Sequence, residues 1–318
     1  MSSAALDVSV TGAPPRTTSA EQIRRGERER RSRDNRIGWA FVAPFTVVFL
    51  MFLIWPLVHG FYLSFTGESI TGAGGELLGF DNYVEALNDP IMWRSLLNTL
   101  WFTVLSTVPL VIVALVLALL VHQGLPGQWL WRLSFFMPFL LASTVAAQFW
   151  IWMYNPQLGL VNYLLGAVGV DPVAWLQDPT WAMFAVVLMT LWWTVGFNFL
   201  LYLTALQNIP EQQYEASALD GAGRWRQLRS ITVPQLGPTT VLIVILQILA
   251  SLKIFDQIYI MTQGGPGGVT RPVVQYVFET GFTGYRFGYA SAIAYIFFAI
   301  IVIISIAQMR LTTRRGAS

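Results

Sequence analysis

Few residues of this 318-residue chain have the chemistry for covalent catalysis. It contains no Cys, and His59 and His122 are its only two His and lie far apart. Thiol nucleophiles and disulfides are therefore excluded, and a His-based metal site is disfavoured. No Ser/His/Asp or paired-carboxylate constellation is evident, and no G-x-x-x-x-G-K-[ST] phosphate-binding loop occurs. The chain is predicted not to be an enzyme and to hold no cofactor or metal.

The most informative spacing lies in a polar segment between two long apolar runs, YEASALDGAGRWRQLRSITVP, residues 214–234. Its order is Glu-Ala-Ser, three residues, Gly221, nine residues, then Ile-Thr-Val-Pro. Ala216 and Ser217 are small enough to permit close approach of a partner, and Glu215 offers a charge for hydrogen bonding. A short rigid helix of this kind can transmit force, which points to mechanical coupling rather than to a reaction.

Residues that favour helix starts and helix ends predict the shape of this segment. Asn208 is a candidate N-cap with Pro210 in the first helical turn, and Gly221 suits a left-handed helix end. A second short helix is expected around Arg224–Ser230, so that residues 208–234 form a helix–turn–helix elbow with Trp225 exposed. An ordinary interfacial helix with a Gly cap is the alternative.

The elements that must position this elbow are membrane spans. Apolar residues make up 55% of the chain and charged residues 11%, with a mean hydropathy of +0.55, whereas soluble domains carry about 25% charged residues. Six apolar runs have the roughly 20 residues that cross the hydrocarbon layer, and backbone groups in lipid require them to be helices. The runs are Ile37–Phe65, Asn98–Val121, Leu130–Tyr154, Trp181–Leu206, Leu236–Met261 and Phe287–Met309. Pro44, Pro56, Pro109 and Pro138 lie inside them and are expected to kink them.

Arginine placement predicts the orientation. Fifteen of the eighteen Arg fall in the N-terminal tail, the loops after the second and fourth runs, and the C-terminal tail. The positive-inside rule makes that side cytoplasmic, so both termini are predicted to be cytoplasmic. The Arg excess, which gives a pI near 9.0, therefore follows the membrane and does not indicate nucleic acid. The expected organisation is a disordered tail over 1–36, a six-helix domain over 37–309 and a cytoplasmic tail over 310–318.

Polar residues inside the spans are the candidates for a solute path. Such residues are functional candidates, although hydrogen bonds between helices are an equally common role. Aromatic faces stack on sugar C–H groups, and hydroxyls and amides bind sugar hydroxyls, so the mixture suits a carbohydrate. The candidates are Ser143, Thr144, Gln148, Thr190, Trp192, Trp193, Thr194, Phe197, Asn198, Gln247, Ser251, Lys253 and Asp256. Lys253 and Asp256, three residues apart, are expected to form a local ion pair.

The polar segment resembles the "EAA" loop of ABC importer permeases, which docks a membrane subunit onto its ATPase. Ser217 stands where the second Ala is usual, and Val233 where Leu is usual. Three further segments resemble the carbohydrate-uptake permeases, the group with the maltose and glycerol-3-phosphate importers. They are FDNYVEALNDPIMWRSLLNT (80–99), LKIFDQIYIMTQGGPGG (252–268) and FGYASAIA (287–294). The chain is most similar to the first of the two membrane subunits of such a system.

This resemblance implies the type I importer permease fold in a bacterial plasma membrane. It implies partners: a second permease subunit, an ATPase dimer that binds ATP and Mg²⁺, an extracytoplasmic solute-binding protein and a sugar. It places ATPase coupling on Glu215, Ala216, Ser217, Asp220, Gly221, Trp225 and Arg226. Alignment on the loop places the substrate path on Ser143, Thr190, Trp193, Thr194, Phe197, Gln247, Ala250 and Ser251. Which sugar is carried, and whether this subunit or its partner holds it, stays open.

Two other classes of protein compete with this interpretation. A self-sufficient secondary transporter needs an inverted repeat, broken helices at the midplane and buried coupling acids, and Asp256 is the one plausible acid. An intramembrane enzyme is disfavoured because a catalytic set is missing from the sequence.

Overall fold

The computed structural model describes residues 38–69, 75–124 and 126–316. It divides into two units, residues 1–59 and 60–318. The first helix, Gly38–Leu63, is long and apolar enough to span a membrane and enters the second unit at Gly60. The predicted tail over 1–36 lies outside the described residues, and the side chains of the predicted tail over 310–318 are described at Arg310 alone.

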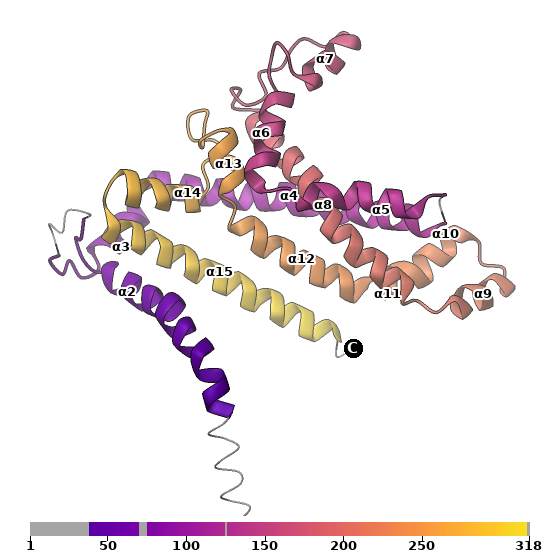
Figure 1. Ribbon diagram of the computed structural model, residues 1–318, viewed down its shortest axis with the longest axis horizontal. Coiled ribbons are helices and arrows are strands. Elements are labelled where there is room, and N and C mark those ends of the chain that lie inside the picture. The colour runs from indigo at the N-terminus through magenta and orange to yellow at the C-terminus, as the bar shows by residue number, and fades with distance from the viewer. Residues whose placement is uncertain (1–37, 70–74, 125, 317–318) are drawn as a thin grey trace, which may run out of the picture. The chain divides into compact units, whose positions relative to one another are not determined.

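The second unit is built from helices, as Figure 1 shows. Outside the helices, the regular structure in the described part of the chain consists of two isolated β-bridges, Thr66 with Leu77 and Ser69 with Arg286. This confirms the all-α prediction. The helices after residue 63 are, in chain order, α3 (Asp81–Asn88), α4 (Pro90–His122), α5 (Gln128–Phe136), α6 (Ser143–Met153), α7 (Leu160–Ala167), α8 (Ala182–Gln207), α9 (Glu211–Leu219), α10 (Arg224–Gln227), α11 (Val233–Gln235), α12 (Gly237–Leu252), α13 (Asp256–Met261), α14 (Val273–Phe278) and α15 (Phe287–Gly316).

Against six predicted spans, the described residues contain four single helices that are long and apolar enough to cross a membrane, and two bent helix pairs that reach this length together. The single helices are Gly38–Leu63, Pro90–His122, Ala182–Gln207 and Phe287–Arg310. In one bent pair, Gln128–Leu140 turns by 101° into Ser143–Met153. In the other, Arg224–Gln235 turns by 58° into Gly237–Leu252.

One of the expected proline kinks coincides with a break in a helix. The 101° bend follows Pro138, where the chain forms a short 3₁₀ turn, Met137–Leu140, before the helix resumes at Ser143. Pro109 lies inside α4, which continues as one helix on both sides of it, so a kink there stays a prediction. The fifth predicted span, Leu236–Met261, is also interrupted: α12 ends at Leu252 and α13 starts at Asp256, with no proline between.

Close packing of α8 holds the bundle together. Ala114, Ala118 and Val121 of α4 pack against Phe199 and the neighbouring buried residues of α8 in one apolar cluster. Small residues on α4 let the two backbones approach, which is the usual basis of helix association in membranes. A second cluster joins α8 to α6 and α13.

Gly196 is needed where α8 crosses α5. A Cβ at this position would lie 2.2 Å from the carbonyl oxygen of Phe135 and 2.7 Å from Cα of Phe136. Backbone atoms of a neighbouring helix cannot give way as a flexible side chain can, so a larger residue must force α5 and α8 apart.

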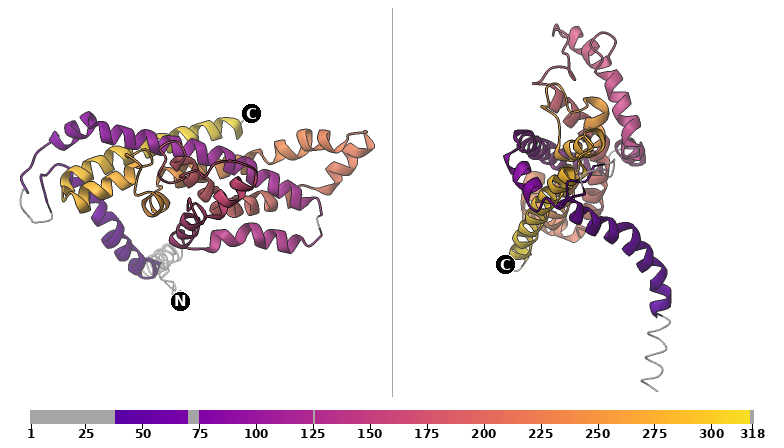
Figure 2. Two further views of the ribbon diagram at one scale, coloured as in Figure 1. Left: turned by 90° about the horizontal axis from the view of Figure 1, so that it is seen from above. Right: turned by 90° about the vertical axis from the view of Figure 1, so that its left-hand side faces the viewer.

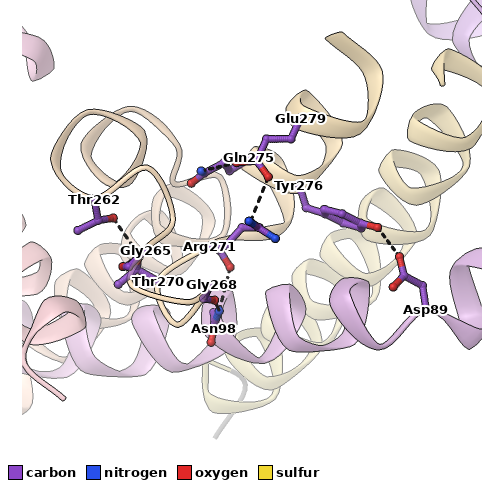
Figure 3. A network of polar contacts seen from close by, with 10 residues as sticks. All are labelled: Asp89, Asn98, Thr262, Gly265, Gly268, Thr270, Arg271, Gln275, Tyr276 and Glu279. Atoms are coloured by element: carbon purple, nitrogen blue, oxygen red, sulfur yellow. Dashed lines mark hydrogen bonds and ion pairs between the residues drawn. The ribbon is translucent and has the colours of Figure 1, made fainter. Parts of the chain in front are cut away.

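Hydrogen bonds fasten the end of the bundle opposite the elbow (Figure 3). The Asn98 side-chain amide on α4 donates to the carbonyls of Gly268 and Arg271 at 2.9 and 3.0 Å. Thr270 donates to the Gly265 carbonyl at 2.7 Å, and Arg271 pairs with Glu279 at 3.1 Å. The glycine-rich segment after α13 is therefore braced against α4 by its own backbone.

Asp89 extends this bracing to α14 and α15. Its carboxylate accepts hydrogen bonds from the Tyr276 and Tyr289 hydroxyls and caps α4 through the Ile91 N–H. Burial acts to raise the pKa of Asp89, but these hydrogen bonds outweigh it and hold its pKa below the ordinary value. The ionised carboxylate thus joins three helices.

We expect Gly196→Ala to destabilise the folded protein by about 1–3 kcal/mol, the usual cost of overpacking. The measurement is the thermal unfolding midpoint in mild detergent. Gly166→Ala is the matched control, because a Cβ at Gly166 in α7 meets nothing within 4 Å. Equal midpoints for the two variants would contradict the packing argument.

Candidate functional site

A cavity of about 410 Å³ lies where two helices are interrupted. One interruption separates Leu140 from Ser143, and the other separates Leu252 from Asp256. The cavity is lined by parts of α8, α12 and the second interruption, with one residue of α4 and one near the first interruption. The lining residues are Phe102, Phe139, Thr190, Trp193, Thr194, Phe197, Asn198, Leu246, Gln247, Ala250, Ser251, Lys253, Ile254, Phe255, Asp256 and Gln257.

Side chains join the two interruptions. The Ser143 hydroxyl, at the first residue of α6, donates to a carboxylate oxygen of Asp256, at the first residue of α13, at 3.2 Å. The indole N–H of Trp193 donates to the Leu141 carbonyl at 3.1 Å. A carbonyl at a helix interruption has lost its helical partner, so this bond replaces one that the break removes.

A chain of hydrogen bonds crosses the interior from α8 through α12 to α4. The Asn198 amide donates to Gln247 at 3.4 Å, and the Gln247 amide donates to the Ser251 hydroxyl at 3.2 Å. Ser251 and Ser106 are 3.0 Å apart, hydroxyl to hydroxyl. All four side chains are buried. These groups therefore join three helices by hydrogen bonds. This is the structural role that the sequence analysis gave as the alternative to contact with a solute.

The structure brings the predicted path residues together. Seven of the eight line the cavity: Thr190, Trp193, Thr194, Phe197, Gln247, Ala250 and Ser251. Ser143 does not line it but bonds to Asp256, which does. Their contact with a solute stays a prediction. The hydroxyl protons of Thr190 and Thr194 go to carbonyls of their own helix at 2.8 and 2.7 Å, so these residues face the cavity as acceptors.

The expected ion pair between Lys253 and Asp256 was wrong. Among the described residues, the ion pairs are Arg271–Glu279 and Arg286–Glu85. Because the helix is interrupted after Leu252, Lys253 and Asp256 are not one turn apart on a common helix. Asp256 bonds to Ser143 instead, and both charged residues are exposed at the cavity.

Sequence reasoning missed several cavity residues. Phe102, Phe139, Leu246, Ile254 and Phe255 are apolar and carry no signal that separates them from lipid-facing residues. Phe139 stacks on Phe197 with ring centroids 5.3 Å apart, next to the first interruption. The Pro138 that precedes it was the one available signal.

The elbow forms a second candidate site at the far end of α8 and α12 (Figures 1 and 2). Gly221 adopts φ +77°, as predicted for a left-handed helix end. The N–H groups of Gly221 and Ala222 donate to the carbonyls of Ala218 and Ser217 at 3.0 and 2.9 Å. This Schellman arrangement satisfies the last carbonyls of α9 and fixes the turn.

Further contacts brace α9 against the second helix of the elbow. The Gln227 amide donates to the Tyr214 carbonyl at 3.1 Å and the Ser217 hydroxyl at 3.0 Å. The hydroxyls of Tyr214 and Thr232 are 2.9 Å apart. The two arms of the elbow are therefore held as one piece.

The predicted coupling residues occupy the surface of this piece. Glu215, Ala216, Asp220, Gly221 and Arg226 are exposed, and Ser217 is half-buried. Trp225 is 76% exposed, and Leu219, which was not assigned a coupling role, is 91% exposed. Their coupling role stays a prediction.

Two details of the elbow differ from expectation. Asn208 ends α8 rather than capping the next helix, and α9 begins after Pro210 without a side-chain cap. The second helix runs from Arg224 to Gln235, beyond the expected Ser230. A π-helical turn, Leu228–Thr232, precedes α11. Pro234 therefore falls in the first turn of α11, where its missing N–H is tolerated and the helix can continue.

The family model for "Binding-protein-dependent transport system inner membrane component" matches residues 92–316. This chain belongs to that family. It is a permease component of a binding-protein-dependent ABC transporter, as its resemblance in sequence indicated.

Named relatives cover most of this permease. The probable ABC transporter permease YurN of Bacillus subtilis is 35% identical, over 86% of this chain and 95% of the relative. The sulfoquinovosyl glycerol permease SmoG of Agrobacterium fabrum is 33% identical, over 87% of this chain and 91% of SmoG. The trehalose/maltose permease MalF of Thermococcus litoralis is 33% identical, over 87% of this chain and 94% of MalF.

The fold matches a solved permease. A chain of a bacterial ABC transporter involved in import of the acidic polysaccharide alginate superposes with a TM-score of 0.81. The superposition covers 91% of this permease and 99% of the alginate transporter chain, at 23% sequence identity. This likeness shows that the permease has the fold of an ABC importer membrane subunit.

Rigidity of the elbow in this permease depends on Gly221. If an ATPase docks on the elbow, as the resemblance to the EAA loop implies, Gly221→Ala should weaken its retention by the purified permease severalfold, because an Ala at positive φ costs about 1 kcal/mol or more and opens the turn. The matched control is Gly223→Ala, at φ −70° with open space around it. Equal ATPase recovery with both variants would argue against a need for the turn.

Proposed function

We propose that this permease forms half of the translocation path of a sugar importer and that a separate ATPase drives it through the elbow. The observation that supports this most strongly is the position of the cavity. It lies at the interruption that ends α12, and the helix Arg224–Gln235 of the elbow precedes α12 directly. Movement of the elbow would thus be passed along one helix to the cavity wall.

The lining of the cavity supports a carbohydrate as the solute. Phe197 is 39% exposed and stacks on Phe139, and Trp193 stands one turn away on α8. Aromatic faces, acceptor hydroxyls of Thr190 and Thr194, and the exposed ends of Lys253 and Asp256 are complementary to a polyhydroxylated ring. Relatives named for trehalose/maltose and sulfoquinovosyl glycerol point to the same class.

The proposed assembly contains this permease, a second permease subunit, two ATPase copies that bind ATP and Mg²⁺, and an extracytoplasmic binding protein. A solved alginate transporter in complex with a pentasaccharide-bound periplasmic protein gives a precedent for the last partner, with a TM-score of 0.80. The Arg distribution supports an orientation with the elbow and both termini in the cytoplasm. ATP hydrolysis belongs to the partner, since this sequence has no phosphate-binding loop.

The test is uptake of labelled neutral and acidic oligosaccharides into proteoliposomes that hold the co-purified complex, with ATP inside or absent. We expect uptake of one sugar class that requires both ATP and the binding protein. Uptake by the chain alone, driven by an ion gradient, would replace this proposal with the secondary-transporter alternative.

Phe197→Ala is expected to raise the concentration of sugar for half-maximal uptake by about fivefold, through loss of a stacking face worth on the order of 1 kcal/mol. Leu188→Ala is the control, because Leu188 lies on the same helix, is exposed, and does not line the cavity. Unchanged sugar dependence in Phe197→Ala would remove the aromatic face from the binding site.

Leu219→Asp and Trp225→Asp are each expected to lower recovery of the ATPase with the permease severalfold, because each replaces an exposed apolar side chain of the proposed docking surface by a charge that is costly to bury against a partner. Circular dichroism and unfolding midpoints should stay at the wild-type values, since neither side chain packs inside the elbow. The control is Leu77→Asp, an apolar position that is 70% exposed in the loop before α3. ATPase recovery unaffected by either elbow change would locate coupling elsewhere.

A further inference from the structure

The α8 wall of the cavity can accept hydrogen bonds from a solute but has few protons to donate. Thr190 and Thr194 donate their hydroxyl protons to the carbonyls of Val186 and Thr190 at 2.8 and 2.7 Å. The indole N–H of Trp193 is donated to the Leu141 carbonyl at 3.1 Å. An indole has one donor and a hydroxyl has one proton, so these three residues offer a solute oxygen lone pairs and an aromatic face.

Asp256 adds a further acceptor on the other side of the cavity. Its carboxylate accepts a hydrogen bond from the Ser143 hydroxyl at 3.2 Å, and the residue is exposed at the cavity. An ionised carboxylate has about four lone-pair positions and no donor. Most of its capacity therefore remains for solute groups that donate.

Lys253 supplies the opposite chemistry. Its ammonium group has three donors and no acceptor, and it takes part in neither ion pair found among the described residues. It lines the same cavity as Asp256 and is exposed there. A solute oxygen can therefore accept from Lys253 while a solute hydroxyl donates to Asp256.

The two charges cancel over the cavity as a whole. Lys253 and Asp256 are the charged members of its lining, and the other polar members are hydroxyls, amides and an indole. A neutral solute meets no net charge there. An acidic solute is attracted by Lys253 but repelled by Asp256, and it must also give up the hydration of its own charge. Because attraction and repulsion offset each other, the desolvation cost disfavours the acidic solute.

We propose that the cavity selects a neutral polyhydroxylated solute, which presents hydroxyl donors to Thr194 and Asp256 and an oxygen acceptor to Lys253. Asp256 is the residue that excludes acidic sugars, because it supplies the negative charge of the lining. This inference rests on the proposed function, because it takes the cavity as part of a sugar path and names the class of sugar.

Selection by charge is tested by direct binding to the purified complex without the binding protein, so that selection by that partner does not enter. The probes are the neutral sugar that the wild-type complex imports best and its uronate, in which a carboxylate replaces one CH₂OH group. Equilibrium dialysis of the labelled probes gives the ratio of their two dissociation constants. We expect the wild type to bind the neutral sugar about tenfold more tightly than the uronate or better.

Asp256→Asn should lower this ratio by about tenfold, because Asn removes the charge but keeps an oxygen that accepts from Ser143. Asp171→Asn is the matched control, since it removes the same charge at an exposed position that does not line the cavity. Loss of folded protein lowers the number of binding sites and not the ratio. An unchanged ratio in Asp256→Asn, or a wild type that prefers the uronate, overturns the proposal.

The direction of the hydrogen bonds is tested with sugars in which fluorine replaces one hydroxyl, which can then no longer donate. At one ring position, fluorine should weaken binding to the wild type by about fivefold. The same change should leave Thr194→Val indifferent, because Val has no oxygen to accept the proton. Thr204→Val is the control, since Thr204 is exposed on α8 outside the cavity and its hydroxyl bonds to its own helix at 2.9 Å. Equal binding of every fluorinated analogue and its parent by the wild type would contradict the acceptor wall.

Failure of this inference is distinct from failure of the proposed function. ATP-dependent import that prefers acidic sugars removes the proposed selection and leaves the importer in place. A wild-type complex that imports the neutral sugar but binds neither probe overturns the cavity as the place of selection. Absence of ATP-dependent import by the whole complex refutes the proposed function, and the inference with it.

Discussion

A helix that crosses lipid must satisfy every backbone N–H and C=O group within the protein, and this chain interrupts two such helices at one place. The rest of the architecture depends on how those interruptions are compensated. Trp193 donates to the free Leu141 carbonyl, and Ser143 ties the start of α6 to Asp256 at the start of α13. Polar residues are therefore concentrated where the breaks are, and the cavity forms there because interrupted helices leave space that side chains do not fill.

One helix, α12, connects the elbow to the cavity. The helix Arg224–Gln235 meets α12 at a 58° bend, and the 16 residues of α12 extend about 24 Å at the rise of an α-helix. Because Gln227 and the Schellman turn at Gly221 hold α9 against this helix, a force on α9 is not absorbed by a flexible joint. The buried chain from Asn198 through Gln247 to Ser251 then couples α12 to α8 and α4.

The opposite end of the bundle is fixed in a different way. There, Asn98 donates to the backbone of the segment after α13, and Asp89 receives hydroxyl groups from α14 and α15. This end is therefore held by hydrogen bonds to backbone carbonyls and to one carboxylate.

The sequence by itself determined the class of protein, the all-α fold and the left-handed turn of the elbow. These follow from local rules: apolar length sets a span, and a glycine at the end of a short polar helix sets a left-handed turn at Gly221. Motif spacing likewise located seven residues that line one cavity, because equivalent positions in related chains keep their helical register. Tertiary structure alone decided the break after Leu252 and the partner of Asp256. The partner of Asp256, Ser143, lies 113 positions away in the chain, and the energy of a polar group is set by what lies opposite it rather than by its neighbours in sequence.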